Sequence, residues 1–147
     1  MEQFKESALG AYSKIVASFR VSDDNTILVA KFNGSYGEGS AGNGDGLFIF
    51  SALVSHYFVF EPVCVILDLT ELNYTWGNTI TKTLNFFQEI GRDREEKAKR
   101  MFIVVSDRNK DGVARLEKVL QGTGRTYCKD DMEALTLAKN DVAAYLA

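Results

Sequence analysis

The sequence is poor in the residues that most reaction centres need. Its 147 residues include one histidine (His56), one proline (Pro62) and two cysteines (Cys64 and Cys128). Any Ser-His-Asp triad, Cys-His pair or multi-histidine metal site would have to use His56, which lies in an apolar segment, so we expect none of them. The cysteines lie in short apolar runs with no CxxC pair, which predicts buried thiols without a disulfide or zinc. We therefore expect a protein that is not an enzyme and has no cofactor or metal.

Neither sign of charge dominates the chain. Seventeen basic and 20 acidic residues give a net charge of −3, and the absence of a basic stripe argues against a nucleic-acid partner. Charged residues interrupt the apolar ones near the N-terminus, unlike in a signal peptide. We expect a cytoplasmic protein that does not contact a membrane. The charge is uneven, because residues 1–91 carry 5 basic and 10 acidic side chains and residues 92–147 carry 12 and 10.

Segments with strand and helix patterns alternate along the sequence, which predicts one α/β domain over residues 1–147. The predicted strands are 26–32, 63–67, 101–105 and 125–128, with 19–21 pairing as a hairpin. The predicted helices are 1–18, 47–60, 78–90, 113–120 and the segment from Asp131 onward. Six glycines between residues 34 and 46 predict a flexible loop. The fold class is therefore a mainly parallel sheet with an antiparallel N-terminal strand pair, flanking helices and an extra N-terminal helix.

Two motifs with known chemistry are present in incomplete form. Residues 37–42 satisfy GxGxxG after a strand, but residues 43–46 separate the motif from the predicted helix and place Asp45 where a phosphate would lie. Asp68 and Asp107 end neighbouring strands, where aspartates commonly bind only the following turn or helix. We favour a plain loop for the first motif and local hydrogen bonding for the second.

A third set of residues resembles the phosphoacceptor site of response-regulator receiver domains. Receivers use an acidic pair, a phosphorylated aspartate, a hydroxyl residue and a lysine, in that order along the chain. The matching residues are Asp23, Asp24, Asp68, Ser106 and Lys129. A predicted strand follows Asp24 where a receiver has a helix, so a degenerate receiver is kept only as an alternative.

From residue 26 onward, the order of elements resembles the STAS domain of bacterial anti-sigma factor antagonists. The likeness is carried by residues 65–74 (VILDLTELNY), 101–106, 116–124 and 131–135. This resemblance implies a STAS-like fold and a regulatory protein partner, such as a kinase or a sigma regulator. In the family, a serine in an Asp-Ser-Ser-Gly-like loop is phosphorylated. Asn78 takes the place of that serine here, and Thr79 is the nearest hydroxyl that could be phosphorylated.

The same loop is the predicted partner-binding site. It contains the only tryptophan, and its residues are Thr75, Trp76, Gly77, Asn78 and Thr79. Tryptophan is a frequent anchor of protein interfaces, although packing against its own domain is the favoured interpretation of this side chain. The segment 47–60 is apolar on all sides and must be covered on two of them. The sheet covers one side, and either the first helix or another protein covers the other, which makes this segment a second possible contact surface. We expect a protein partner, with a homodimer and an immunity protein that neutralises a toxin as alternatives.

Overall fold

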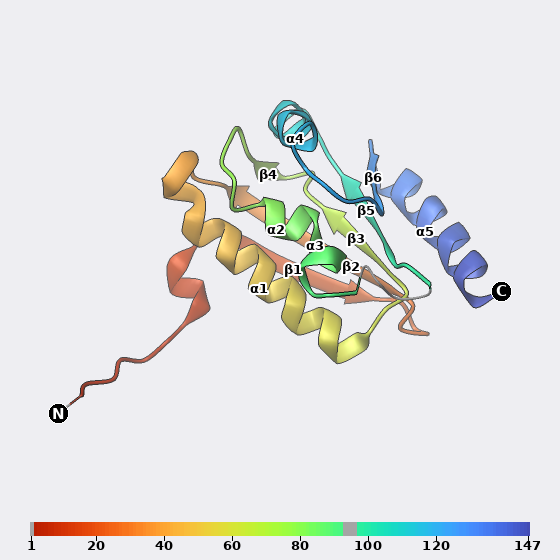
Figure 1. Ribbon diagram of the computed structural model, residues 1–147, viewed down its shortest axis with the longest axis horizontal. Helices are drawn as coiled ribbons and strands as arrows, with labels where there is room; N and C mark the ends of the chain where they lie inside the picture. The colour runs from red at the N-terminus through yellow and green to blue at the C-terminus, as the bar shows by residue number, and fades with distance from the viewer. Residues whose placement is uncertain (1, 93–96) are drawn as a thin grey trace.

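The computed structural model describes residues 2–92 and 97–147, and its centre is one six-stranded sheet (Figure 1). The strand order is β1-β2-β3-β5-β6, with β4 beside the end of β2. β1 and β2 are antiparallel and the other pairs are parallel, as predicted. The strands are β1 (Val16–Val21), β2 (Ile27–Ser35), β3 (Cys64–Asp68), β4 (Leu72–Asn73), β5 (Arg100–Val104) and β6 (Arg125–Cys128). All five residues of β3 are buried, because helices cover both faces of the sheet there.

The helices form two unequal layers. α1 to α4 contribute to the larger core on one face, and α5 packs on the opposite face, mainly against β3 and β5. Figure 1 shows α1 and α5 on opposite sides of the sheet. The helices are α1 (Asn43–Phe60), α2 (Thr81–Leu84), α3 (Phe86–Glu89), α4 (Lys110–Glu117) and α5 (Asp131–Leu146). The predicted α/β class with flanking helices is confirmed.

The extra N-terminal helix predicted over residues 1–18 is wrong. Within the described part of that segment, only Leu9–Tyr12 forms a short 3-10 turn, and β1 begins at Val16. The apolar residues fit a strand, because Ala17 and Phe19 pack on the core while Val16, on the opposite face of the strand, is 64% exposed. Residues 2–8 run away from the body of the molecule as an arm (Figure 1).

Two other helix boundaries differ from the prediction. α1 begins at Asn43, so residues 43–46 are its first turn and do not belong to a loop. The helix expected over 78–90 is two short helices, α2 and α3, separated at Asn85. The side chain of Asn85 accepts a hydrogen bond from Arg125 Nη1 at 2.5 Å, which ties the break to the start of β6.

Candidate functional site

The predicted contact loop, Thr75–Thr79, connects β4 to α2 beyond the carboxyl ends of the parallel strands. This is the edge where ligand and partner sites of α/β sheets usually lie. Thr75, Trp76 and Asn78 are exposed, Thr79 is half-buried and Gly77 is buried. The structure therefore brings the five residues together as one short surface segment with its middle glycine turned inward.

Hydrogen bonds to four consecutive backbone carbonyls fix the path of this loop. Arg115 Nη2 donates to the carbonyl of Thr75 at 2.8 Å, and the hydroxyl of Tyr74 donates to that of Gly77 at 2.7 Å. The amide of Gly39 donates to the carbonyl of Trp76 at 3.4 Å, and Thr81 donates to that of Asn78 through its amide and its hydroxyl. A loop held in this way loses little further backbone entropy when it binds a partner.

Trp76 combines exposure with a fixed seat. Its side chain is 56% exposed, although its ring lies against the backbone of Gly39. A Cβ at Gly39 would approach the ring to 2.5 Å, and Gly39 has a φ of +56°, so glycine is required there for two independent reasons. Packing on the domain and exposure to solvent thus occur together, because one edge of the indole lies against Gly39 while the side chain remains 56% exposed.

Thr79 ties the loop to the start of α1 and does not cap α2. Its hydroxyl donates to the carbonyl of Gly42 at 3.1 Å and also pairs with the hydroxyl of Tyr36. α2 has no side-chain cap, so the Thr79 hydroxyl makes no bond to the start of that helix. Because its only proton is used for Gly42, Thr79 accepts the proton of Tyr36. A phosphate on Thr79 would require this three-residue contact to open.

Two buried tyrosines support the loop, a role that no sequence pattern predicted. The rings of Tyr36 and Tyr74 meet edge to face with centroids 5.2 Å apart. Burial raises the pKa of Tyr74 to about 12, and burial is also the main cause of the raised pKa of Tyr36. Both phenols therefore stay protonated at neutral pH and act as hydrogen-bond donors to the loop.

The GxGxxG segment at residues 37–42 is a turn whose polar groups already have partners. It ends in a 3-10 turn, Gly39–Gly42, that leads directly into α1. Asp45, in the first turn of α1, accepts hydrogen bonds from the amide of Gly37 at 2.8 Å and from the hydroxyl of Ser13 at 2.6 Å. A carboxylate of the chain itself thus lies at the helix start where a dinucleotide fold would hold phosphate.

The two strand-end aspartates have different partners. Asp68 is 2% exposed and accepts hydrogen bonds from the amide and the hydroxyl of Thr70 at 2.9 and 2.5 Å. Asp107 is exposed and pairs with Lys110 at 2.9 Å. Asp68 also interacts with the carboxyl group of Asp131, at the start of α5. The pKa of Asp131 is raised, mainly by burial and also by Asp68. The nearest contacts of both strand-end aspartates are therefore local, as predicted from the sequence.

The receiver-like set is not assembled. The turn that contains Asp23 and Asp24 precedes β2, and Asp24 binds Ser22 and Thr26 there. Ile27 pairs with the first residue of β3, whereas Asp68 is the last residue of β3. The acidic pair and the proposed phosphoacceptor therefore lie at opposite ends of the sheet, about 13 Å of strand apart. The receiver alternative is wrong for this chain.

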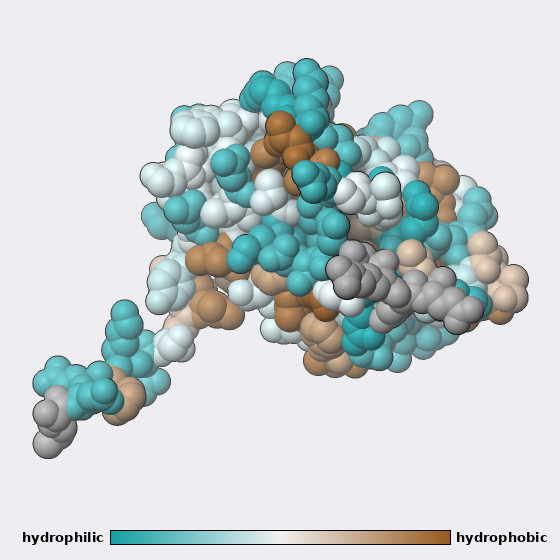
Figure 2. Space-filling model, viewed as in Figure 1, coloured by the Kyte–Doolittle hydropathy of each residue, from teal (hydrophilic) through white to brown (hydrophobic). Residues whose placement is uncertain are grey.

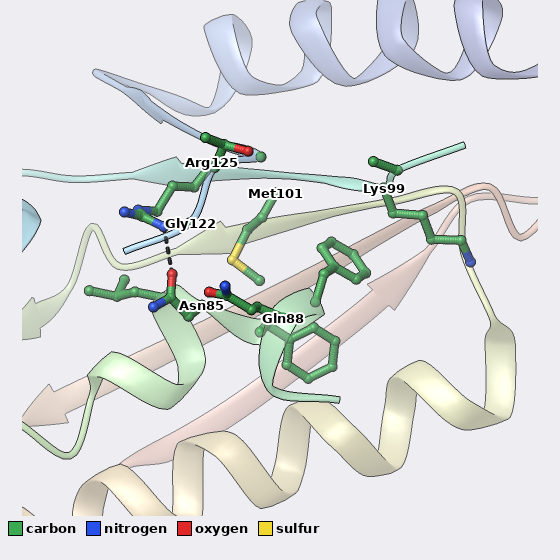
Figure 3. Close-up of a pocket in the computed structure, with 12 residues that line it drawn as sticks. Asn85, Gln88, Lys99, Met101, Gly122 and Arg125 are labelled. Atoms are coloured by element: carbon green, nitrogen blue, oxygen red, sulfur yellow. Dashed lines mark hydrogen bonds between the residues drawn. The ribbon is translucent and has the colours of Figure 1, made fainter. Parts of the chain in front are cut away.

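A cavity of about 240 Å³ lies between α3 and the first residues of β5 and β6. Figure 3 shows Arg125 bonded to Asn85, while the ammonium of Lys99 turns away from them. Glu117 holds the guanidinium of Arg125 through two bonds of 2.7 and 3.0 Å, and Lys99 donates to Tyr57 at 2.8 Å. Because its two cations diverge and are already paired, the cavity does not form an anion site.

The outer side of α1 is a second apolar surface. No charged residue occurs between Gly46 and Phe60. Leu47, Phe58 and Val59 are 51%, 47% and 74% exposed. Figure 2 shows brown patches along the part of the molecule where Figure 1 draws α1. The sheet covers the inner side of the helix, whereas the side that carries Leu47, Phe58 and Val59 faces solvent.

The remaining candidate residues have structural partners. His56 is half-buried, stacks on Phe19 with centroids 3.5 Å apart, and its Nδ1 bonds to the carbonyl of Ala52. Cys64 and Cys128 are buried free thiols. In the described residues, no three His, Cys, Asp or Glu side chains are grouped to hold a metal, and no helix is long and apolar enough to cross a bilayer.

Solved structures share this architecture. An anti-sigma factor antagonist from Mycobacterium paratuberculosis is 13% identical, with a TM-score of 0.54 over 86% of this chain and 95% of that one. The anti-sigma factor antagonist SpoIIAA, in its unphosphorylated form, is 12% identical, with a TM-score of 0.55 over 85% and 97%. The chain has the fold of the anti-sigma factor antagonists. The STAS-like fold expected from the resemblance is confirmed. No family model and no curated protein matches the sequence.

Proposed function

We propose that this chain is a non-catalytic, cytoplasmic regulatory module that binds another protein through the Thr75–Thr79 loop. The observation that carries the proposal is the exposed Trp76 on a loop whose backbone is already bonded. Tryptophans in such positions dominate many interfaces, because a large apolar area is buried at little entropic cost. The shared fold supports a regulatory partner of the kind that anti-sigma factor antagonists bind.

Regulation by phosphate differs here from that expected of the family. Asn78, which we aligned with the phosphorylated serine, has no hydroxyl. Thr79 has one, but its hydroxyl bonds to Gly42 and Tyr36. We propose that phosphate on Thr79 would release the loop from α1 and weaken partner binding, because a dianion cannot donate to the carbonyl of Gly42.

Affinity purification from the native cell tests the proposal. The wild-type chain and a Trp76→Ala variant are used as bait, and Met132→Ala, which removes an exposed side chain on α5, is the matched control. Loss of an anchor tryptophan costs about 2 kcal/mol or more, so the affinity of Trp76→Ala for the partner should fall about 30-fold and its recovery should fall accordingly. A partner that Trp76→Ala and Met132→Ala recover equally would contradict the proposal.

The identity of the recovered protein separates the remaining alternatives. A kinase or sigma regulator supports the regulatory role, whereas a basic toxin supports an immunity protein, whose acidic residues 1–91 would steer the partner. Recovery of the chain itself, lost on substitution of Phe58 on α1, supports a homodimer through the apolar surface of that helix.

A further inference from the structure

A groove of about 350 Å³ lies on the face of the sheet opposite α1, between α5 and the first two strands. It exists because the helical layer on this face is incomplete. α5 packs over β3 and β5, with only marginal contact to β2. In the described chain, the α5 side of β1 has no covering helix.

The floor and one wall of the groove are apolar. Ile27 and Val29 of β2 and Ile66 of β3 form the floor, and Leu135 of α5 forms the wall. Ile27 and Ile66 are almost completely buried, whereas Leu135 is 41% exposed. An alkyl group placed here would remove the exposed surface of Leu135 from water, which is favourable in proportion to the area covered.

Two cations stand on opposite walls. Arg20, on β1, is the register partner of Val29, and Lys139 lies one helical turn after Leu135. Neither side chain makes an ion pair or a hydrogen bond with any part of the chain that the structure describes. Cations that make no close ion pair, beside an apolar floor, are complementary to a negative charge with an apolar body.

One acidic residue, Asp131, also lines the groove. It begins α5, two turns before Lys139, so the two Cα atoms are about 12 Å apart along the helix. Burial and the neighbouring Asp68 raise the pKa of Asp131, and Lys31 and Arg20 act in the opposite sense. The carboxylate of Asp131 therefore lies at the end of the groove near Asp68, and the space beside Lys139 is cationic.

We propose that this groove binds an unbranched alkyl carboxylate of about ten carbons, with its carboxylate between Arg20 and Lys139 and its chain along Ile27, Ile66 and Leu135. A volume of about 350 Å³ equals about twelve water-sized volumes, which matches the roughly twelve non-hydrogen atoms of decanoate. One turn of a helix about 10 Å across is larger than this space, which disfavours a protein segment as the occupant. The site goes beyond the proposed function, because it uses neither the Trp76 loop nor α1.

Titration of the 15N-labelled full chain with decanoate, below its micellar concentration, tests the site. Saturable one-to-one shifts should appear at Val29, Ile66 and Leu135. Binding should strengthen by up to fourfold for each methylene from octanoate to decanoate and by less for dodecanoate, which overfills the groove. Decanol and decyltrimethylammonium, which lack the negative charge, should bind at least tenfold more weakly.

The double variant Arg20→Gln, Lys139→Gln tests the two cations. Both side chains are exposed, so the fold should tolerate the change, and urea unfolding verifies this. Decanoate should bind at least tenfold more weakly to this variant and normally to the matched control Arg108→Gln, Lys118→Gln. Equal binding by both variants would overturn the proposal, as would equal affinity for decyltrimethylammonium or shifts confined to the apolar surface of α1.

Discussion

Replacement of Asn109 by alanine should be among the most damaging single changes outside the apolar core. Asn109 is 2% exposed, and its Nδ2 donates to the carbonyls of Leu69 and Leu72 at 2.6 and 3.0 Å. Its Oδ1 accepts from the amide of Ser106 at 3.0 Å. The carbonyl of Leu69 keeps a bond from the amide of Leu72, so the change orphans two groups, the buried carbonyl of Leu72 and the part-buried amide of Ser106. Each orphaned group costs about 1–3 kcal/mol, which gives a loss of about 3 kcal/mol or a fall in Tm of about 10 °C.

Urea unfolding monitored by circular dichroism measures this loss, with the exposed Asn78→Ala as control and an expected change within about 0.5 kcal/mol. Asn109→Asp is a second variant, because it keeps the acceptor for Ser106 but turns a carboxylate oxygen toward two carbonyls. At pH 7 it should be at least as unstable as Asn109→Ala, and near pH 3 protonation should restore one donor and part of the loss. An Asn109→Ala protein within 0.5 kcal/mol of wild type would refute the reasoning.

Three further changes test other contacts. Gly39→Ala should push the Trp76 ring off its seat, lower stability by about 1 kcal/mol and red-shift the tryptophan emission; an unchanged spectrum would be inconsistent with the seat. Burial and the neighbouring Asp68 raise the pKa of Asp131 in the folded state, so its ionisation lowers stability as pH rises through that pKa. The stability of Asp131→Asn relative to wild type should therefore increase from pH 3 to pH 7, and a flat difference would contradict the raised pKa. Burial raises the pKa of the Cys64 thiol to about 12, so it should react with a disulfide reagent at pH 8 only on unfolding, and prompt reaction would contradict its burial.

The sequence was informative where one pattern excluded the others. The short uninterrupted apolar run at residues 63–67 predicted a strand inside a parallel sheet, and all five residues of β3 are buried. Val16 and Phe19 fitted both a helix and a strand, and only contact with β2 decides between them. β4 has two residues and therefore no period to detect.

The position of the candidate loop could be predicted from the sequence, but the contacts that hold it could not. The loop position of Trp76 was predicted, but packing of its side chain on the domain was favoured over exposure, and the side chain is 56% exposed. The bond between Tyr36 and Thr79 joins residues 43 positions apart, and the support of the loop by Arg115 spans 40. Contacts of that separation depend on how the strands are ordered in the sheet, which no local pattern encodes.

The environment of Trp76 during binding tests the central claim most directly. Because the chain has one tryptophan, 5-fluorotryptophan labelling gives a single 19F resonance. Titration with the recovered partner should shift this resonance, with saturation at one equivalent and loss of its response to solvent isotope. A partner that binds at full affinity and leaves the resonance unchanged would show that the protein is recognised through another surface.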